Sequence, residues 1–280
     1  MMSVVFPSLW AVHIAGGVLS WAWVGGGFFA CLLLVGFAVV PTFRKPGCVG
    51  EEEIPRIALL TAAFFVAGLI HVRIGPTSVH LLLNGLVGVL LGRRSALAIC
   101  VGIMLQAFLL GHGDVSTIGV NGCVMTLPAL VSYSLYRGLR TAPALGLPEA
   151  LLACSFVLYP WSVLVGGPLA IALKRVNRGL GISREFRAGF LTGGLAVILT
   201  VVLNCLVLIA GGVEDWRAWA GVSFLAHLPV ALIEGVITGF TVDFLARVSP
   251  GMLGGRPVAL RPEVVPLQPI GNSSSSGTSH

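Results

Sequence analysis

The chain has 280 residues, of which 56% are hydrophobic and only 10% are charged, and its formal net charge is +6. A soluble domain carries about 25% charged residues, and the mean hydropathy here is +0.97. This composition excludes an ordinary soluble domain. The Lys and Arg residues fall in short loops between apolar runs, where they indicate topology rather than nucleic-acid binding. We therefore expect an integral membrane protein that is surrounded by lipid and has no nucleic-acid partner.

The apolar runs predict an all-α, polytopic membrane helix bundle with about seven core spans. In chain order, these spans are expected near residues 21–40, 57–72, 81–92, 95–110, 122–136, 188–210 and 219–246. A further apolar stretch at 148–173 is interrupted by Pro160 and Pro168. It begins and ends beside basic loops, so it either crosses twice as an extra helical hairpin or does not cross.

Three regions are expected along the chain. Residues 1–12 form an N-terminal extension, which lacks the basic start and the small-residue cleavage site of a signal peptide. Residues 13–249 form the transmembrane domain. Residues 250–280 are rich in Pro, Gly and Ser, which predicts a disordered cytoplasmic tail.

The distribution of basic residues predicts the orientation in the membrane. Basic loops lie at 44–56, 93–94, 137–140, 174–187 and 247–261, and the positive-inside rule places such loops in the cytoplasm. We expect a multi-pass protein of the inner (plasma) membrane, with its N-terminus outside and its C-terminus in the cytoplasm.

The stretch around residues 74–85 interrupts the apolar pattern at membrane depth. Gly75 and Pro76 end the preceding helix, and Thr77 and Ser78 are good N-cap residues, which places His80 in the first turn of a new helix. Irregular backbone is tolerated there only if it is buried in protein or lines a polar cavity. His80 is therefore either part of a binding site or a core histidine that is hydrogen-bonded to a nearby carbonyl.

The predicted topology brings further histidines to the same outer side as this break. They are His13, His71 and His112. Such imidazoles can form a nitrogen-rich site for nickel, cobalt, copper or zinc. A ligating histidine usually bonds a second group through its other ring nitrogen, and the candidates for that role are Thr77, Ser78, Asn84 and Asn121. No phosphate-binding loop or organic-cofactor motif is found, so any active transport would need separate ATPase subunits.

Four motifs give the chain a specific resemblance. They are HIAGGVLS at 13–20, GPTSVHLLLNG at 75–85, GHGDVSTIGVNGCVM at 111–125 and AHLPVALIEGVITG at 226–239. In this order they resemble the CbiM/NikM family, the substrate-binding (S) subunits of energy-coupling factor (ECF) transporters for cobalt and nickel. The resemblance implies capture of Co2+ or Ni2+ as the transported substrate. It also implies a CbiQ-like transmembrane coupling subunit, CbiO-like ATPases and, in cobalt members, a small CbiN-like subunit.

The resemblance also implies which residues bind the metal. In the family, an N-terminal Met-His supplies its amine, a backbone amide nitrogen and a ring nitrogen, and a second histidine supplies the fourth nitrogen. The matching residues are His13 and His80. Here eleven residues precede Val12, so we hypothesise a translation start at a Val12 codon that is read as Met. The alternative is that the extension is genuine and the site is altered. Gly16 also stands where the family usually has an acidic residue.

The remaining histidines of the outer side each have two interpretations. His112 lies either on the metal's access route or in a turn hydrogen bond. His71 is either an extra ligand or a polar contact at the outer rim.

Polar residues of the last span are expected to serve structure. His227 and Glu234 are two helical turns apart, so they share a face, and we expect them inside the bundle in a structural network. Asp243 and Arg247 are four apart and can pair.

The sequence leaves three functional interpretations. The first is a metal-capturing transport subunit rather than an enzyme. The second is a protein of the same fold that has lost metal binding, and the third is an intramembrane metalloenzyme with Glu234 as its base. Nickel and cobalt accept the same ligands, so the sequence does not separate them.

Overall fold

The protein is described by a computed structural model that covers residues 13–44, 53–74, 77–141 and 183–253. At residues 41–44, 71–74, 77–78 and 141 it describes the backbone alone. The predicted extension at 1–12, the hairpin at 148–173 and the tail from residue 254 onward lie outside the described residues.

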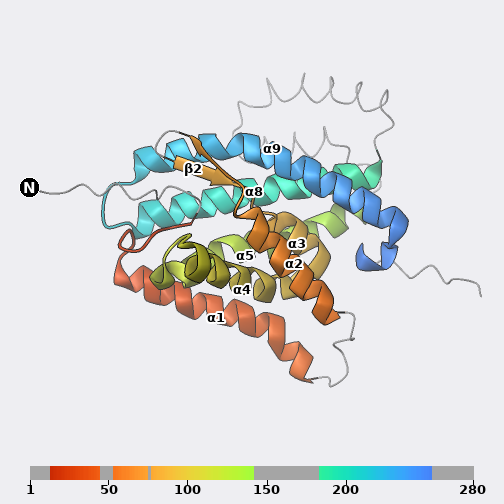
Figure 1. Ribbon diagram of the computed structural model, residues 1–280, viewed down its shortest axis with the longest axis horizontal. Helices are drawn as coiled ribbons and strands as arrows, with labels where there is room; N and C mark the ends of the chain where they lie inside the picture. Colours follow the sequence, from red (N-terminus) through yellow and green to blue (C-terminus); the bar gives the residue numbers. More distant parts are fainter. Residues whose placement is uncertain (1–12, 45–52, 75–76, 142–182, 254–280) are drawn as a thin grey trace, which may run out of the picture.

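Long helices make up most of the described chain (Figure 1). In order, the elements are α1 Trp21–Arg44, α2 Glu53–Ala67, β1 His71–Ile74, β2 Thr77–His80, α3 Asn84–Leu91, η1 Gly92–Arg94, α4 Ser95–Leu110, η2 Val115–Thr117, α5 Ile118–Thr141, α8 Arg184–Gly211, α9 Arg217–Val248 and η4 Pro250–Leu253. The helical membrane bundle that the sequence predicts is confirmed in this coarse form.

Five segments of the described chain are long and apolar enough to cross a membrane. They are Trp21–Val40, Asn84–Leu110, Val115–Arg140, Arg184–Gly211 and Arg217–Val248. The second of these combines α3 and α4, and α2 has only 15 residues, which is short for the about 20 that an upright span needs. The prediction of seven core spans is therefore not confirmed.

The break before α3 folds differently from the prediction. Residues Thr77–His80 are a strand that pairs antiparallel with His71–Ile74, and His71 lies opposite His80 in the register. Thr77 and Ser78 are therefore not the N-cap of a helix, and His80 is not in a first helical turn, because α3 begins only at Asn84. The cross-strand backbone bonds satisfy the polar groups that an unpaired break would expose. The small sheet also departs from an all-α fold.

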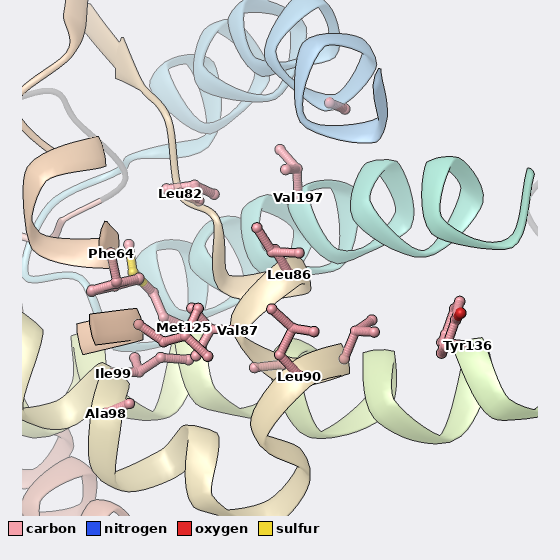
Figure 2. Close-up of a cluster of buried hydrophobic side chains, with 14 of the residues drawn as sticks. Phe64, Leu82, Leu86, Val87, Leu90, Ala98, Ile99, Met125, Tyr136 and Val197 are labelled. Carbon is pink, nitrogen blue, oxygen red and sulfur yellow. The ribbon is translucent and has the colours of Figure 1, made fainter. Parts of the chain in front are cut away.

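Helix α3 lies at the centre of the apolar core. Residues 84–90 are all buried, and their apolar side chains pack with Phe64 of α2, Ile99 of α4, Met125 of α5 and Val197 of α8 (Figure 2). A helix that is apolar on every side is expected in such an enclosed position. Because α3 begins four residues after His80, the core holds the C-terminal end of the segment that carries this histidine.

Glycines allow the helices to approach each other closely. A Cβ on Gly88 of α3 would lie 2.0 Å from the carbonyl oxygen of Ala129 in α5, and one on Gly189 of α8 would lie 2.9 Å from the Cα of Gly239 in α9. Small residues serve this purpose in membranes, where packing rather than hydrophobicity holds helices together. The contacts join α3 to α5 and α8 to α9.

The outer helices expose large apolar side chains. Trp21 and Leu32 of α1 are 83% and 70% exposed, and Leu225 and Phe240 of α9 are 65% and 64% exposed. Apolar faces of this size are unsuited to water and suit the hydrocarbon of a bilayer. The surface therefore agrees with the composition in indicating a membrane protein.

Basic residues gather at one end of the bundle, where α1, α5 and α9 end and α2 and α8 begin (Figure 1). Arg94 pairs with Glu53, Arg140 pairs with Glu185 at 3.1 Å, and the predicted pair of Asp243 and Arg247 is confirmed. This is the end that the positive-inside rule predicts to be cytoplasmic.

The prediction that disorder begins at residue 250 is wrong for its first four residues. Pro250–Leu253 form the short helix η4, and the side chain of Leu253 is buried. Arg56 donates hydrogen bonds to the carbonyls of Leu90 and Met252, and Arg140 donates one to that of Leu253. These contacts with two arginines hold η4 on the bundle.

Candidate metal centre

Three imidazoles from distant parts of the chain lie together away from the basic end. The ring centroids are 5.1 Å apart for His13 and His80, 6.0 Å for His13 and His112, and 5.8 Å for His80 and His112. The rings of His13 and His80 are nearly parallel, at 10°. Both of these residues are 3% exposed, whereas His112 is partly exposed. Two enclosed imidazoles thus lie beside a third that reaches toward the surface.

Helix α5 holds the backbone next to His13. The side chain of Asn121 accepts a hydrogen bond from the N–H of Ile14 at 2.9 Å and donates one to its carbonyl at 3.1 Å. Thr117 also donates to the same carbonyl, at 2.6 Å. Because Thr117 ends η2 and Asn121 lies four residues later in α5, the two side chains form one polar face toward residue 14. The position of His13 therefore depends on α5.

The segment that follows His13 pairs with the loop between α8 and α9. Ser20 donates a backbone hydrogen bond to Gly211 at 3.0 Å, and Val213 donates one to Val18 at 3.0 Å. These bonds satisfy backbone groups that precede α1 and close the bundle at this end.

The turn at residues 111–114 carries His112 to the same place. Gly111 and Gly113 have φ values of 62° and 79°, which glycine adopts without a steric penalty. The N–H of His112 donates to the carbonyl of Gln106 at 3.1 Å, and Gly113 lies against the Cβ of His13. The backbone of His112 makes this turn bond, and its imidazole lies beside the other two rings.

The sequence after β2 fixes the tautomer of His80. Its Nδ1 lies 3.0 Å from the carbonyl oxygen of Leu81. A carbonyl oxygen only accepts hydrogen bonds, so Nδ1 carries the proton and Nε2 carries the lone pair. In this form an imidazole can bind a metal through Nε2.

The environment of His13 also favours a neutral imidazole. Its Nδ1 is buried and makes no hydrogen bond with any residue that the structure describes. Burial lowers the pKa of His13 well below 6.5, and the positive charges that His80 and His112 can carry lower it further. Neutral His13 therefore offers a ring nitrogen to a cation without first releasing a proton.

Asp114 occupies the space above Gly16. A Cβ on Gly16 would lie 2.6 Å from the Cγ of Asp114. The carboxylate also accepts hydrogen bonds from the N–H of Ser116 at 2.8 Å and from its hydroxyl at 2.6 Å, and these bonds lower the pKa of Asp114. The position that lacks an acidic side chain in this sequence thus has a carboxylate beside it that comes from residue 114.

The other predicted site residues are distributed unevenly. Asn84 is buried, but its amide donates to the carbonyl of Met125 at 3.1 Å and to the hydroxyl of Thr200 at 2.7 Å, so it joins α3 to α5 and α8. His71 pairs with His80 through the backbone register, and Thr77 and Ser78 lie in β2. The structure thus brings His13, His80, His112 and Asn121 together and gives Asn84 a packing role.

Glu234 and His227 are enclosed in the bundle but bond different groups. The Nδ1 of His227 lies 2.7 Å from the carbonyl of Ser223 in its own helix. Glu234 accepts hydrogen bonds from the N–H groups of Leu82 and Leu83. Its carboxyl group is thus engaged by the backbone and not by an imidazole, which argues against its use as the base of an enzyme.

Within the described ranges, no group of three or more His, Cys, Asp or Glu side chains meets the geometry of a metal site. The imidazoles are near one another, but their nitrogens do not converge on one point. The ligand set that the family resemblance implies contains only two side chains, His13 and His80, and takes its other two nitrogens from the amine of the preceding residue and the backbone of His13, so it is not a group of three side chains.

Sequence reasoning missed the roles of three residues around the imidazoles. The role of Thr117 could have been found, because it precedes Asn121 by four residues, at the junction of η2 and α5. Asp114 and Glu234 act on Gly16 and on backbone N–H groups, and neither partner carries a side chain that would mark the contact in the sequence.

The fold and the cluster of His13, His80 and His112 define a polytopic membrane protein with a group of imidazoles at one end. Comparisons with known proteins identify its family. The family described as cobalt uptake substrate-specific transmembrane region, CbiM, matches residues 13–252. The chain belongs to this family and is a component of a CbiM-type system for cobalt or nickel uptake.

Relatives and solved structures agree with this placement. The chain is 29% identical to a putative metal transport protein of Haemophilus influenzae, with 86% of this chain and 97% of that protein covered. It is 25% identical to the cobalt transport protein CbiM of Acetohalobium arabaticum, with 93% and 92% covered. A crystal structure of a transition metal transporter has the same fold, with a TM-score of 0.61, 18% identity, and 84% and 93% covered. These similarities are to transport proteins rather than to enzymes.

Proposed function

We propose that this protein is the substrate-capture subunit of an ECF-type importer for cobalt or nickel ions. One observation carries the proposal: His13 and His80 stack at 5.1 Å in a buried position, each with a ring nitrogen that can bind a cation. Nδ1 of His13 makes no hydrogen bond with a described residue, and Nε2 of His80 carries the lone pair of that ring. Nitrogen ligands of this kind suit Ni2+ and Co2+.

The other residues at this end have distinct tasks in the proposal. Asn121 fixes the backbone that follows His13. His112 is the most exposed of the three imidazoles, so it meets a cation first and transfers it inward. The mouth of the site faces the outside of the inner membrane, because the basic loops lie at the other end.

Release into the cytoplasm would require partners. No nucleotide-binding motif is found in the sequence, so ATP hydrolysis would come from CbiO-like ATPases through a CbiQ-like transmembrane subunit. The basic end would face them. Co-purification from cells that express all subunits tests this part, and recovery of the chain alone would contradict it.

Calorimetric titration with Ni2+ and Co2+ tests metal capture directly. Two forms are compared in detergent: the chain as printed, and a shorter form that starts with Met in place of Val12. We expect tighter binding by the shorter form, because only it has a free amine next to His13. Equal, tight binding by both would assign the missing nitrogen to His112 or His71.

The His80→Ala variant of each form is the matched control. It removes a proposed ligand, and we expect no measurable binding at concentrations that saturate the parent form. Metal binding that survives this substitution, or no binding by either parent form, would contradict the proposed function. The second outcome would favour a protein that has kept the fold and lost its metal.

A further inference from the structure

One peptide unit connects the buried carboxyl group of Glu234 to the imidazole of His80. The carbonyl of Leu81 accepts a hydrogen bond from Nδ1–H of His80 at 3.0 Å. The N–H of Leu82, which belongs to the same planar amide, donates to Oε1 of Glu234. The sequence of contacts is therefore carboxyl, amide and imidazole, and it ends at the lone pair of Nε2.

Glu234 is enclosed and is aimed at this loop. It lies near the middle of α9 and is 0% exposed. The N–H of Leu83 donates to both of its oxygens, at 2.9 Å each. Among the described residues Glu234 forms no ion pair. The carboxyl oxygens of Glu234 thus accept hydrogen bonds from the backbone N–H groups of Leu82 and Leu83, which lie just after His80.

The backbone at this point needs such support. Leu83 has a φ of 50°, and in the described chain it is the only non-glycine residue with a positive φ. L-residues rarely adopt this conformation, and it persists where surrounding contacts determine it. It turns the chain from β2 into α3, and the Glu234 carboxyl group bonds the N–H of this same residue.

The arrangement corresponds to a known way of preparing a histidine for a metal. Ligating histidines usually donate their second ring N–H to a carboxylate or a carbonyl, which fixes the tautomer and the ring orientation. Here the acceptor is a carbonyl, and the opposite end of its amide is held by a carboxyl group. Hydrogen bonds in such a chain polarise and strengthen each other.

We propose that Glu234 is a positioning residue for metal capture, which acts through the Leu81–Leu82 peptide to hold His80 in the Nδ1-protonated form, with the lone pair on Nε2. It is not a ligand, because both of its oxygens accept N–H groups. The inference rests on the proposed function only in that Nε2 of His80 binds the metal. It also makes α9 the helix that controls His80.

Two substitutions at one position test this role. Glu234→Ala removes the acceptor, and Glu234→Gln keeps an acceptor oxygen in nearly the same volume. The matched control is Thr238→Val, one helical turn further along α9, because the hydroxyl of Thr238 is buried and makes no hydrogen bond within the described part of the chain. If the alanine variant does not fold, the glutamine variant still decides the question.

The first measurement needs no metal. Nitrogen-15 spectra of the metal-free protein report which ring nitrogen of His80 is protonated, and the His80→Ala variant assigns its signals. We expect a single Nδ1-protonated tautomer in the parent and in Thr238→Val, a tautomer mixture in Glu234→Ala, and a smaller shift toward a mixture in Glu234→Gln. An unchanged tautomer in both Glu234 variants would overturn the inference.

The second measurement is Ni2+ affinity by calorimetry. We expect Glu234→Ala to weaken binding by about 10–100-fold, as removal of such supporting groups generally does. Glu234→Gln should have a smaller effect, and Thr238→Val none. Wild-type affinity in both Glu234 variants would overturn the inference. A parent that shows the expected tautomer but binds no metal would instead contradict the proposed function and leave the positioning of His80 intact.

Discussion

The segments that carry His13 and His80 lie side by side, yet different helices hold them. Next to His13, the backbone of Ile14 is bracketed by the side chain of Asn121 from α5. After His80, the backbone of Leu82 and Leu83 is bonded by Glu234 from α9. In both segments a buried polar side chain satisfies backbone groups, but the two side chains belong to different helices.

This difference shows how the imidazoles can respond to a rearrangement of the bundle. Helix α9 packs against α8 through backbone contacts at Gly189 and Gly239, whereas α5 contacts α3 at Gly88. A displacement of α9 would therefore act on the His80 segment through Glu234, while the contacts of α3 with α5 hold the other side of that segment. Packed helices commonly slide in this way, by small amounts.

The largest effect is expected when the hydrogen bonds from Asn121 of α5 to the backbone of Ile14 are removed. We expect Asn121→Leu to lower Ni2+ affinity by about 10–100-fold. The substitution leaves the buried N–H of Ile14 without its acceptor, so the free energy of unfolding should also fall by about 1–3 kcal/mol. The tautomer of His80 should not change, because the Glu234 side is intact. Calorimetry, denaturation and nitrogen-15 spectra measure the three quantities.

Ser132→Ala is the matched control for this prediction. Ser132 is a buried polar residue of α5 whose hydroxyl bonds the carbonyl of Pro128 in its own helix. If it weakens metal binding as much as Asn121→Leu does, the effect comes from α5 in general and not from the bracket around Ile14.

A smaller effect is expected where Asp114 meets Gly16. Gly16→Asp places a Cβ 2.6 Å from the Cγ of Asp114, and such overpacking typically costs about 1–3 kcal/mol of stability. In the Gly16→Asp, Asp114→Ala double variant the space is restored, so the double variant should be more stable than the sum of the single effects predicts. Thermal unfolding of the four proteins measures this coupling. Strictly additive changes would show that the two positions do not compete for space.

The smallest expected effect is on the pH dependence of stability, and it comes from His13 alone of the two stacked histidines. Burial keeps the pKa of His13 below its value of 6.5 in the unfolded chain, so below pH 6.5 the unfolded state binds more protons than the folded state. The stability of the metal-free protein should therefore be constant above about pH 6.5 and decrease as pH falls below it. His13→Gln should flatten this decrease. Melting temperatures measured across this range test it, and equal slopes for the two proteins would contradict it.

The membrane bundle could be predicted because long apolar runs and basic loops are features of the local sequence. They indicate spans and orientation without knowledge of the tertiary contacts. The sequence also grouped His13, His80 and His112 on one side, since alternate loops of a multi-pass chain emerge on the same side. It did not predict the strand pair at 71–80. Thr77 and Ser78 suit a helix N-cap as well as a strand, and the antiparallel pairing with 71–74 decides between them.

The supporting contacts were harder to foresee for a different reason. Glu234 was expected inside the bundle, because a carboxyl group is costly against lipid. Its partners are main-chain N–H groups more than 150 residues away, and main-chain groups are the same at every position of a sequence. Asp114 likewise fills a space that a glycine leaves. Such contacts become visible only in three dimensions.

The short helix η4 has a practical consequence for handling the protein. It is held by Arg56 and Arg140 at the basic end, and α9 separates it from the loop at 211–216 that pairs with the segment after His13 (Figure 1). A purification tag or fluorescent reporter joined to the chain beyond Leu253 therefore leaves from the end opposite the imidazoles. One joined ahead of His13 leads directly into them, so assays of metal uptake are best performed with the label at the carboxyl terminus.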